Sequence, residues 1–145
     1  YFSHLPFAAS KGEVLIAEIP DLPPTHIFKK GMSLVPWKTG QYWIGSTYQW
    51  KFANEFPTDS FRQNTEKWLQ SFYKLSYKIV DHFAAVRPAT IERRPFVGFH
   101  PSCPQIGIFN GMGTKGISLA PFFAKQFVDH LSQQTPIQDE VNIKK

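Results

Sequence analysis

The stretch IFNGMGTKGISLAPFFAKQFVDHL, Ile108 to Leu131, combines a short strand pattern, a glycine-rich turn and an amphipathic helix pattern. Gly111, Gly113 and Gly116 fall within six residues, directly before the helix. Glycine tolerates positive φ and has no Cβ, so the backbone of such a turn can approach a ligand closely. The first amides of a helix are unpaired and carry partial positive charge, which favours an anion or a carbonyl oxygen gaining charge. The alternative is an ordinary strand-to-helix turn, and spacing alone does not separate the two.

The composition describes one globular domain of ordinary size. The chain has 145 residues, 42% hydrophobic and 16% aromatic, which is enough for an apolar core. Its formal net charge of +5 comes from scattered basic residues, a pattern that disfavours a nucleic-acid-binding face. The single cysteine, Cys103, excludes an internal disulfide and is typical of a reducing compartment, so we expect a cytoplasmic protein. No apolar run approaches ~18 residues, so no membrane span is expected.

Periodicity and turn residues predict strands with few helices. The expected elements, in chain order, are a strand at 11–19, a hairpin at 29–50 with one strand before Pro36 and a turn near Gly40, a helix at 58–73, a strand at 77–90, strands at 93–99 and 104–109, and a final helix. This order predicts an α+β fold with a mixed, mostly antiparallel sheet flanked by helices.

Two apolar stripes define the expected helices. Thr58 or Asp59 can cap the first helix, and Pro121 fits the second only in its first turn. After Gln134 the chain resembles a loose terminus. The helical stripes are Phe61, Trp68, Leu69 and Phe72 in the first helix, and Leu119, Phe123, Phe127 and Leu131 in the second.

Arg87 is the first candidate for binding an anion. It follows a small apolar run, and Pro88 holds its backbone extended. A guanidinium at a buried strand end needs an anion, and its planar fork matches a carboxylate. An internal ion pair with Asp81 or Glu92 explains the same pattern, so the sequence leaves both open.

Other motifs give weaker signals. The aromatic residues Tyr42, Trp43, Tyr48 and Trp50 alternate along an expected strand, with one face in the core and the other on the surface or lining a pocket. His82, His100 and His130 have no metal-ligand spacing, so no metal site is expected. No G-x-S-x-G is present and Cys103 has no evident base, so hydrolase chemistry is not supported.

Four ordered stretches resemble the D-amino-acid-oxidase family of FAD-dependent oxidoreductases, which includes glycine oxidase and sarcosine-oxidase-like enzymes. They are PFAASKGEVLIAE, SLVPWKTGQYWIGSTYQW, HFAAVRPATIERRPFVGF and IFNGMGTKGISLAPFFAKQF, together spanning roughly residues 6 to 132. The resemblance is to the C-terminal, substrate-domain part of a two-domain flavoprotein. The chain has no initiator methionine, so we expect a fragment whose N-terminal FAD-binding half is absent.

The resemblance implies roles for particular residues. Arg87 matches the arginine that grips the substrate carboxylate, and Tyr48 or Trp50 is the candidate pocket aromatic. A small amine or amino acid is the implied substrate, which is oxidised by hydride transfer to flavin, and no catalytic side chain is assigned. Met112 and Thr114 replace a histidine or an arginine of some members, which leaves the substrate open. The flavin-edge loop comprises Gly111, Met112, Gly113, Thr114, Lys115, Gly116 and Ile117.

The implied organisation has three parts. Residues 1–90 form a substrate-binding domain, residues 91–134 a segment packing against the absent FAD-binding domain, and residues 135–145 a tail. FAD is then held mostly by the absent half, so this chain alone is expected to be inactive. Two alternatives stay open: a stand-alone binding or interaction module without flavin, and a flavin oxidoreductase domain that modifies tRNA.

Overall fold

The computed structural model describes residues 1–74 and 76–144, which form two compact units. Unit 1 comprises Tyr1–Ser10 and Arg87–Lys145, and unit 2 comprises Lys11–Val86. Within the described residues, no helix has the length and apolar character needed to cross a bilayer. The elements are β1 (Ser10–Glu18), β2 (Phe28–Lys30), β3 (Met32–Lys38), β4 (Gln41–Gly45), α1 (Asp59–Gln70), β5 (Lys78–Arg87), β6 (Phe96–His100), β7 (Cys103–Asn110), η1 (Gly113–Lys115) and α2 (Gly116–Gln133).

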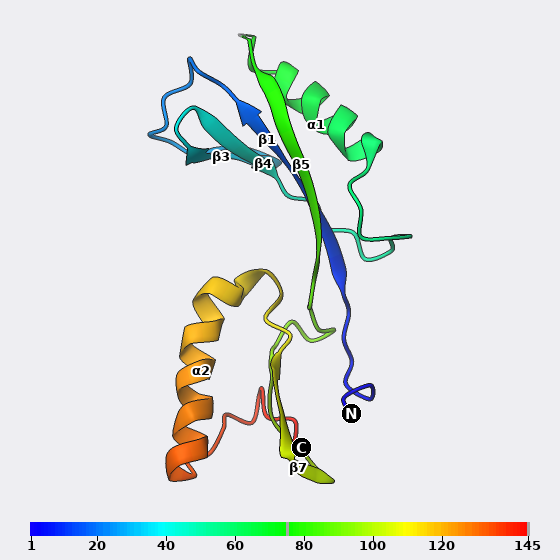
Figure 1. Cartoon of the computed structure of the whole chain (residues 1–145), viewed down its shortest axis with the longest axis vertical. Coiled ribbons are helices and arrows are strands. Elements are labelled where there is room, and N and C mark those ends of the chain that lie inside the picture. Colours follow the sequence, from blue (N-terminus) through cyan, green and yellow to red (C-terminus); the bar gives the residue numbers. More distant parts are fainter. Residues whose placement is uncertain (75, 145) are drawn as a thin grey trace. The chain divides into compact units, whose positions relative to one another are not determined.

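Unit 2 is a five-stranded sheet with a helix beside it (Figure 1). The strand order is β2-β3-β4-β1-β5, and the β1–β4, β3–β4 and β2–β3 pairs are antiparallel. The predicted hairpin is confirmed as β3 and β4, and Gly40 lies between them at φ +70°. One detail was wrong, because β3 continues through Pro36 instead of ending before it. At Pro36 the strand has passed the end of its pairing with β2 but is still paired with β4, opposite Tyr42.

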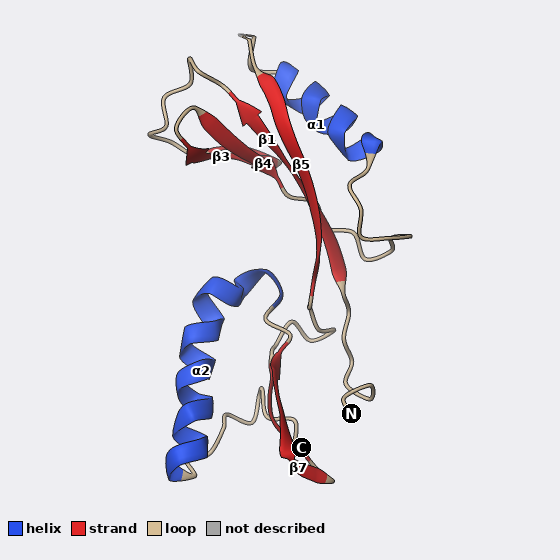
Figure 2. Cartoon of the chain, in the orientation of Figure 1, coloured by secondary structure: helices blue, strands red, loops and turns tan. Residues whose placement is uncertain are grey.

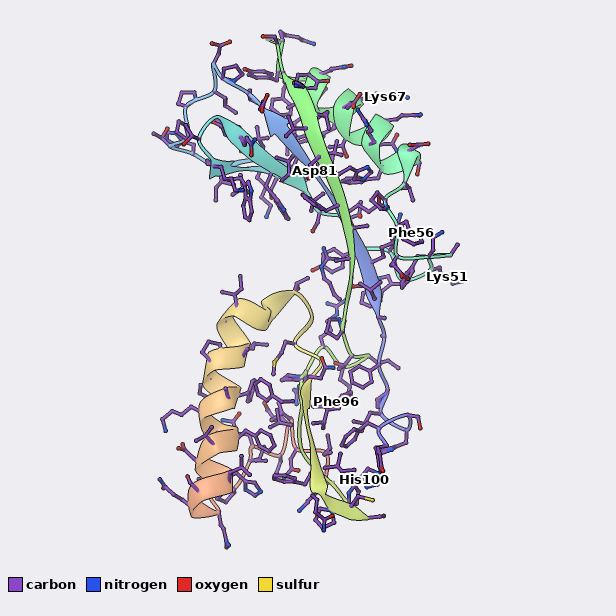
Figure 3. The ribbon with its side chains drawn as sticks, viewed as in Figure 1. Lys51, Phe56, Lys67, Asp81, Phe96 and His100 are labelled. Carbon is purple, nitrogen blue, oxygen red and sulfur yellow. The ribbon has the colours of Figure 1, made fainter. Side chains whose placement is uncertain are left out.

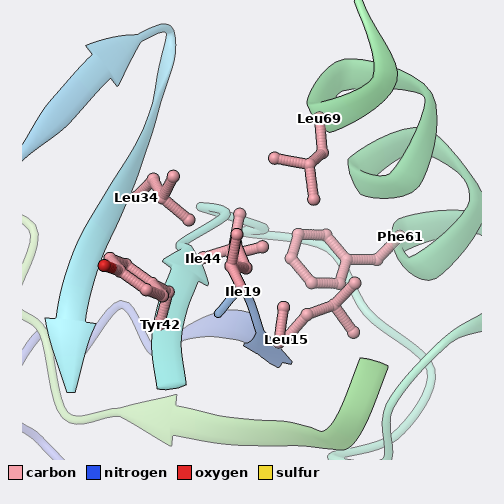
Figure 4. Close-up of a cluster of buried hydrophobic side chains, with 8 residues drawn as sticks. Leu15, Ile19, Leu34, Tyr42, Ile44, Phe61 and Leu69 are labelled. Carbon is pink, nitrogen blue, oxygen red and sulfur yellow. The ribbon is translucent and has the colours of Figure 1, made fainter. Parts of the chain in front are cut away.

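The core of unit 2 lies between this sheet and α1 (Figure 4). The helix contributes Phe61 and Leu69, as its apolar period predicted. Its first turn is capped by Thr58, whose hydroxyl accepts a hydrogen bond from the Phe61 amide at 3.3 Å. The buried side chains facing them come from the sheet and its margin: Leu15, Ala17, Ile19, Leu34, Tyr42 and Ile44.

Unit 1 is built on the antiparallel hairpin of β6 and β7, with α2 alongside (Figure 2). Phe123 of α2 is buried in its core, and Phe127 packs on the hairpin with its ring centroid 5.3 Å from that of Phe99. Gly107 keeps this contact close, because a Cβ there would lie 3.2 Å from the Phe127 ring. Together the two units confirm the predicted α+β class with mostly antiparallel strands.

Two expectations for the C-terminal region were wrong. Pro121 is not in the first turn of α2, because the helix begins earlier, at Gly116. The segment after Gln134 is not loose, since Ile137 and Val141 are 4% and 3% exposed and belong to the unit 1 core. The carbonyl of Val141 also accepts a hydrogen bond from the Val97 amide at 2.9 Å. This segment therefore adds to β6 and buries apolar side chains.

Candidate functional site

The glycine-rich turn lies in unit 1, between β7 and α2, as predicted. Gly111 and Gly113 have φ values of +81° and +56°, a region that side chains with a Cβ adopt at a cost. Gly116 instead has the helical φ of −53°. The turn tightens into η1, which runs directly into α2. The first two glycines are thus needed for the backbone path, whereas the third is not.

This turn packs directly against the loop that follows Arg87. The Gly113 amide donates a hydrogen bond to the Pro88 carbonyl at 3.2 Å. A Cβ on Gly111 would lie 2.6 Å from the Thr90 methyl group, which is too close for any real side chain. A Cβ on Gly113 would lie 3.6 Å from that of Ala89. The structure therefore brings the glycine-rich turn next to the loop after Arg87, the two stretches that the sequence offered as candidates for ligand binding.

The loop after Arg87 is held firmly within unit 1. Thr90 is 1% exposed, and its hydroxyl donates to the Arg94 carbonyl at 2.7 Å and accepts from the Arg94 amide at 3.0 Å. On the other side, the Ala8 amide donates to the Ala89 carbonyl at 2.8 Å, next to a bridge between Phe7 and Thr90. Figure 3 shows Phe96 of β6 in the same unit, where its ring makes an edge contact with that of Phe7 at 5.1 Å. Hydrogen bonds to two separate segments therefore hold the backbone of this loop in place.

Arg87 is the last residue of β5 and is half-buried. Its carbonyl accepts a hydrogen bond from the Ala89 amide at 2.9 Å, which closes a tight turn over Pro88. Of the two acids considered as internal partners, Asp81 accepts a hydrogen bond from the backbone of His82 at 2.8 Å. The guanidinium therefore starts from a fixed strand end, and its function stays a prediction.

The helical segment formed by η1 and α2 has no side-chain cap at its start among the described residues. The Lys115 amide bonds to the Met112 carbonyl at 3.2 Å, and the Gly113 amide is already paired with Pro88. Thr114 is exposed and Ile117 is 96% exposed, so the outer surface of the turn is open. An uncapped and accessible helix start is a suitable place for an electron-rich ligand atom.

The predicted aromatic strand is only partly confirmed. Tyr42 is buried, but β4 ends at Gly45, so the alternation does not continue. Tyr48 and Trp50 are 53% and 51% exposed, and their ring centroids lie 6.5 Å apart. Tyr48 belongs to unit 2, whereas Arg87 belongs to unit 1. The role of Tyr48 in substrate binding stays a prediction.

The sequence analysis missed a buried charge cluster in unit 2. Glu13 is fully buried, and its carboxylate accepts hydrogen bonds from the Thr58 amide at 2.6 Å and the Thr58 hydroxyl at 2.9 Å. Lys11, 2% exposed, lies 3.4 Å from this carboxylate and donates to the carbonyl of Phe56, whose connector is visible in Figure 3. The Nε2 atom of His82 lies 3.1 Å from the Oε2 atom of Glu13. Lys11 and Glu13 share the strand face of Leu15, which was the available signal.

The hydrogen bonds decide the charge of Glu13. Burial alone raises the pKa of a carboxyl group, but the Thr58 amide and hydroxyl and the Lys11 ammonium outweigh it, so the pKa of Glu13 lies below 4.5. The cluster joins β1 to the start of α1 as an ionic anchor. The three histidines without metal-ligand spacing all have hydrogen-bonding partners: His82 with Glu13, His100 with the Tyr1 carbonyl and His130 with the Thr135 carbonyl. No cluster of metal-ligating side chains occurs among residues 1–74 and 76–144.

A family model described as FAD dependent oxidoreductase (DAO) matches residues 2–130. The chain belongs to this family. This confirms the resemblance that four stretches of the sequence carried, and with it the dependence of the family on FAD. The match includes both the Arg87–Thr90 loop and the glycine turn.

Individual relatives agree with the family assignment. Glycine oxidases of Pseudomonas aeruginosa and Bacillus subtilis are each 28% identical to the chain, over 140 and 139 residues. The chain aligns over 93% and 92% of its own length, but it spans only 38% and 37% of theirs. Similar folds occur in an iminodiacetate oxidase from Chelativorans sp. BNC1 (TM-score 0.77, 15% identity, 95% of this chain and 40% of that one) and in a glycine oxidase from Bacillus cereus (0.74, 18%, 90% and 37%).

Proposed function

We propose that the chain is the C-terminal part of an FAD-dependent oxidoreductase that oxidises a small amine or amino acid, with Arg87 gripping the substrate carboxylate. One observation carries the proposal: the loop after Arg87 and the glycine turn are hydrogen-bonded to each other, from the Gly113 amide to the Pro88 carbonyl. The loop that follows the strand end of Arg87 and the turn that precedes α2 are therefore joined by a hydrogen bond within unit 1. The family match and the glycine oxidase relatives support this assignment.

The glycine turn fits the edge of a flavin ring. A helix leaves its first amides unpaired, and those of Gly113 and Lys115 are engaged internally. The amides of Met112 and Thr114 are therefore the donors that we assign to the ring, and the predicted flavin-edge loop of residues 111–117 supplies the surface around them. FAD, when bound, accepts the hydride from the carbon that bears the amine. The helix start stabilises negative charge that develops beside it, and this favours the reduced form over the oxidised one.

Arg87 orients the substrate. A guanidinium pairs with a carboxylate through two parallel hydrogen bonds, which fixes position and rotation together. The arginine suits this task because its backbone is held at a strand end by the Ala89 amide. The substrate class that follows is a small amine with a carboxylate, as in an amino acid. We assign no proton-transfer step to any side chain of this chain.

The test of this role uses the complete protein with Arg87→Ala and Arg87→Lys. Charge-assisted hydrogen bonds contribute about 1.5–3 kcal/mol, so we expect kcat/KM for amino acids to fall by roughly 10- to 100-fold, mainly through KM. For an amine without a carboxylate, the same variants are expected to match the wild type. Arg93→Ala is the matched control, since Arg93 is an exposed arginine of the same segment. An unchanged KM in Arg87→Ala removes this residue from the site.

The outer face of α2 supports a partner domain supplied by the same polypeptide. Ile117 and Val128 are 96% and 59% exposed and lie on one side of the helix, away from the buried Phe123. Leu131, which the apolar stripe of Phe123 was predicted to include, is 60% exposed at the end of the helix. We infer that an N-terminal FAD-binding part covers this face and holds most of the cofactor. The 145-residue chain alone is then expected to purify colourless. Tight, stoichiometric FAD on this chain contradicts that expectation. We also place the protein in the cytoplasm, as the single cysteine predicted.

A further inference from the structure

A hollow of about 210 Å³ opens on the surface of unit 2, between β2 and α1. We propose that it binds a small aromatic anion, meaning a flat ring that carries a carboxylate or a phosphate. The hollow contains no residue of the proposed flavin and substrate site, so the inference does not depend on the proposed function. Its lining residues are Phe28, Lys29, Lys30, Trp68 and Phe72.

The walls of the hollow are preorganised aromatic rings. Trp68 and Phe72 meet edge to face, with ring centroids 4.8 Å apart and an interplanar angle of 74°. The Trp68 indole N–H donates to the Lys30 carbonyl at 2.6 Å, which fixes the orientation of the ring. Phe28 packs against the unit 2 core beneath them. A cavity of roughly 150 Å³ is sufficient for benzene, so this hollow has room for one ring with a substituent.

The charge at the rim selects an anion. Lys29 and Lys30 are exposed on β2, the edge strand of the sheet, and neither forms an ion pair within the described part of the chain. The Lys30 ammonium lies 5.9 Å from the centroid of the Phe72 ring, so a cation is already held over the wall. A neutral ring would leave both charges unused, and a cationic ring would be repelled by them. A ring with a negative substituent can pack against Trp68 and Phe72 while its charge pairs with Lys29 or Lys30.

The test follows the Trp68 indole N–H signal by two-dimensional NMR in the 145-residue chain, assigned by its loss in Trp68→Phe. Indole-3-acetate probes the carboxylate and phenyl phosphate probes the phosphate, with the neutral indole-3-acetamide as the reference compound. We expect a saturable shift of this signal, with the better anion binding at least about tenfold more tightly than the amide. No saturable shift with either anion, or equal affinity for the amide, overturns the proposal. The stronger of the two anions identifies the substituent.

Charge variants separate the hollow from general electrostatics. Lys29→Gln together with Lys30→Gln is expected to weaken anion binding about tenfold and leave amide binding unchanged. Lys67→Gln is the matched control, because Lys67 lies on α1 beside Trp68 but does not line the hollow (Figure 3). If Lys67→Gln weakens binding as strongly as the double variant, the anion is attracted by the overall positive charge and the site is refuted. The chemical shifts of the remaining tryptophan indoles report that the fold is intact.

Discussion

Replacing Glu13 with glutamine removes the negative charge from the buried anchor of unit 2 and keeps the shape of the side chain. The carboxylate accepts two hydrogen bonds from Thr58 at 2.6 and 2.9 Å and faces Lys11 at 3.4 Å. The variant leaves the Lys11 ammonium, 2% exposed, without its counter-ion. Breaking a buried ion pair on one side costs about 3–5 kcal/mol, and we expect Glu13→Gln to lose at least about 3 kcal/mol of unfolding free energy.

The assay is urea unfolding followed by tryptophan fluorescence. All four tryptophans of the chain lie within Lys11–Val86, so this signal reports unit 2. Glu66→Gln is the control, because Glu66 forms an exposed pair with Arg62 at 3.0 Å and such pairs contribute less than about 1 kcal/mol. Adding Lys11→Met to Glu13→Gln is expected to recover part of the loss, since the unpaired charge is gone. If Glu13→Gln and Glu66→Gln have the same stability, the anchor does not stabilise the fold.

The same carboxylate predicts a pH dependence. Its pKa in the folded chain lies below the ordinary value of 4.5, because the hydrogen bonds from Thr58 and the charge of Lys11 outweigh the effect of burial. A lowered folded-state pKa stabilises the fold fully above the unfolded-state value, and this contribution is lost as pH falls through the folded-state value. The stability difference between wild type and Glu13→Gln is therefore expected to be constant above about pH 5 and to shrink on acidification below 4.5. A difference that grows on acidification contradicts this sign.

Two further predictions concern unit 1. Gly111→Ala is expected to destabilise the chain by more than about 2 kcal/mol, because its Cβ would lie 2.6 Å from Thr90 and its φ is +81°. Gly116→Ala lies at a helical position, where the nearest atom is 3.6 Å from the added Cβ, and is expected to be neutral or stabilising by up to about 1 kcal/mol. Both are measured by urea unfolding followed by circular dichroism. Equal effects would refute the assignment of the turn. Hydrogen exchange is expected to show that the Val97 amide, which donates to the Val141 carbonyl, is protected. Val141→Ala removes a buried side chain and is expected to lower the free energy of opening at Val97 by about 2 kcal/mol. An unprotected Val97 amide in the wild type would mean a loose C-terminus.

The local elements of the fold were predictable because their signals are short-range. Thr58 precedes an apolar period of 3.6 in which Phe61 and Leu69 fall on one face, and this cap and face are what the structure contains. Gly40 marks the hairpin because a tight turn needs positive φ at that position. These signals lie within a few residues of the feature that they specify. They required no knowledge of the tertiary contacts.

Two errors concern where strands end and what covers them. The polar stretch after Gln134 has no periodicity, yet Ile137 and Val141 are buried because β6 offers an unpaired edge that the sequence does not reveal. Tyr48 and Trp50 follow an apparent alternation, but the strand ends at Gly45 and leaves them exposed. For Ile137 and Val141, a contact about 40 positions along the chain decided the outcome.

The candidate site divides in the same way. The glycine turn was recognisable from its own residues. The loop that it contacts lies more than 20 positions earlier, so no local signal linked the two. Before the structure showed the hydrogen bond from Gly113 to Pro88, only the family resemblance suggested that they belong to one site. The charge cluster was missed because its members come from three separate segments. Lys11 and Glu13 on the buried face of an apolar strand were its only local sign. In a sequence, two opposite charges two positions apart on a buried strand face therefore indicate a possible ion pair that also binds the N-cap residue of the following helix, as Glu13 binds Thr58.

The most direct test of the central claim is a crystal structure of the complete polypeptide with FAD. The account predicts that the pyrimidine edge of the flavin lies within hydrogen-bonding distance, about 2.7–3.2 Å, of an amide of Met112 or Thr114, with the Arg87 guanidinium facing the substrate side of the ring. A flavin ring bound away from residues 111–117 would contradict it.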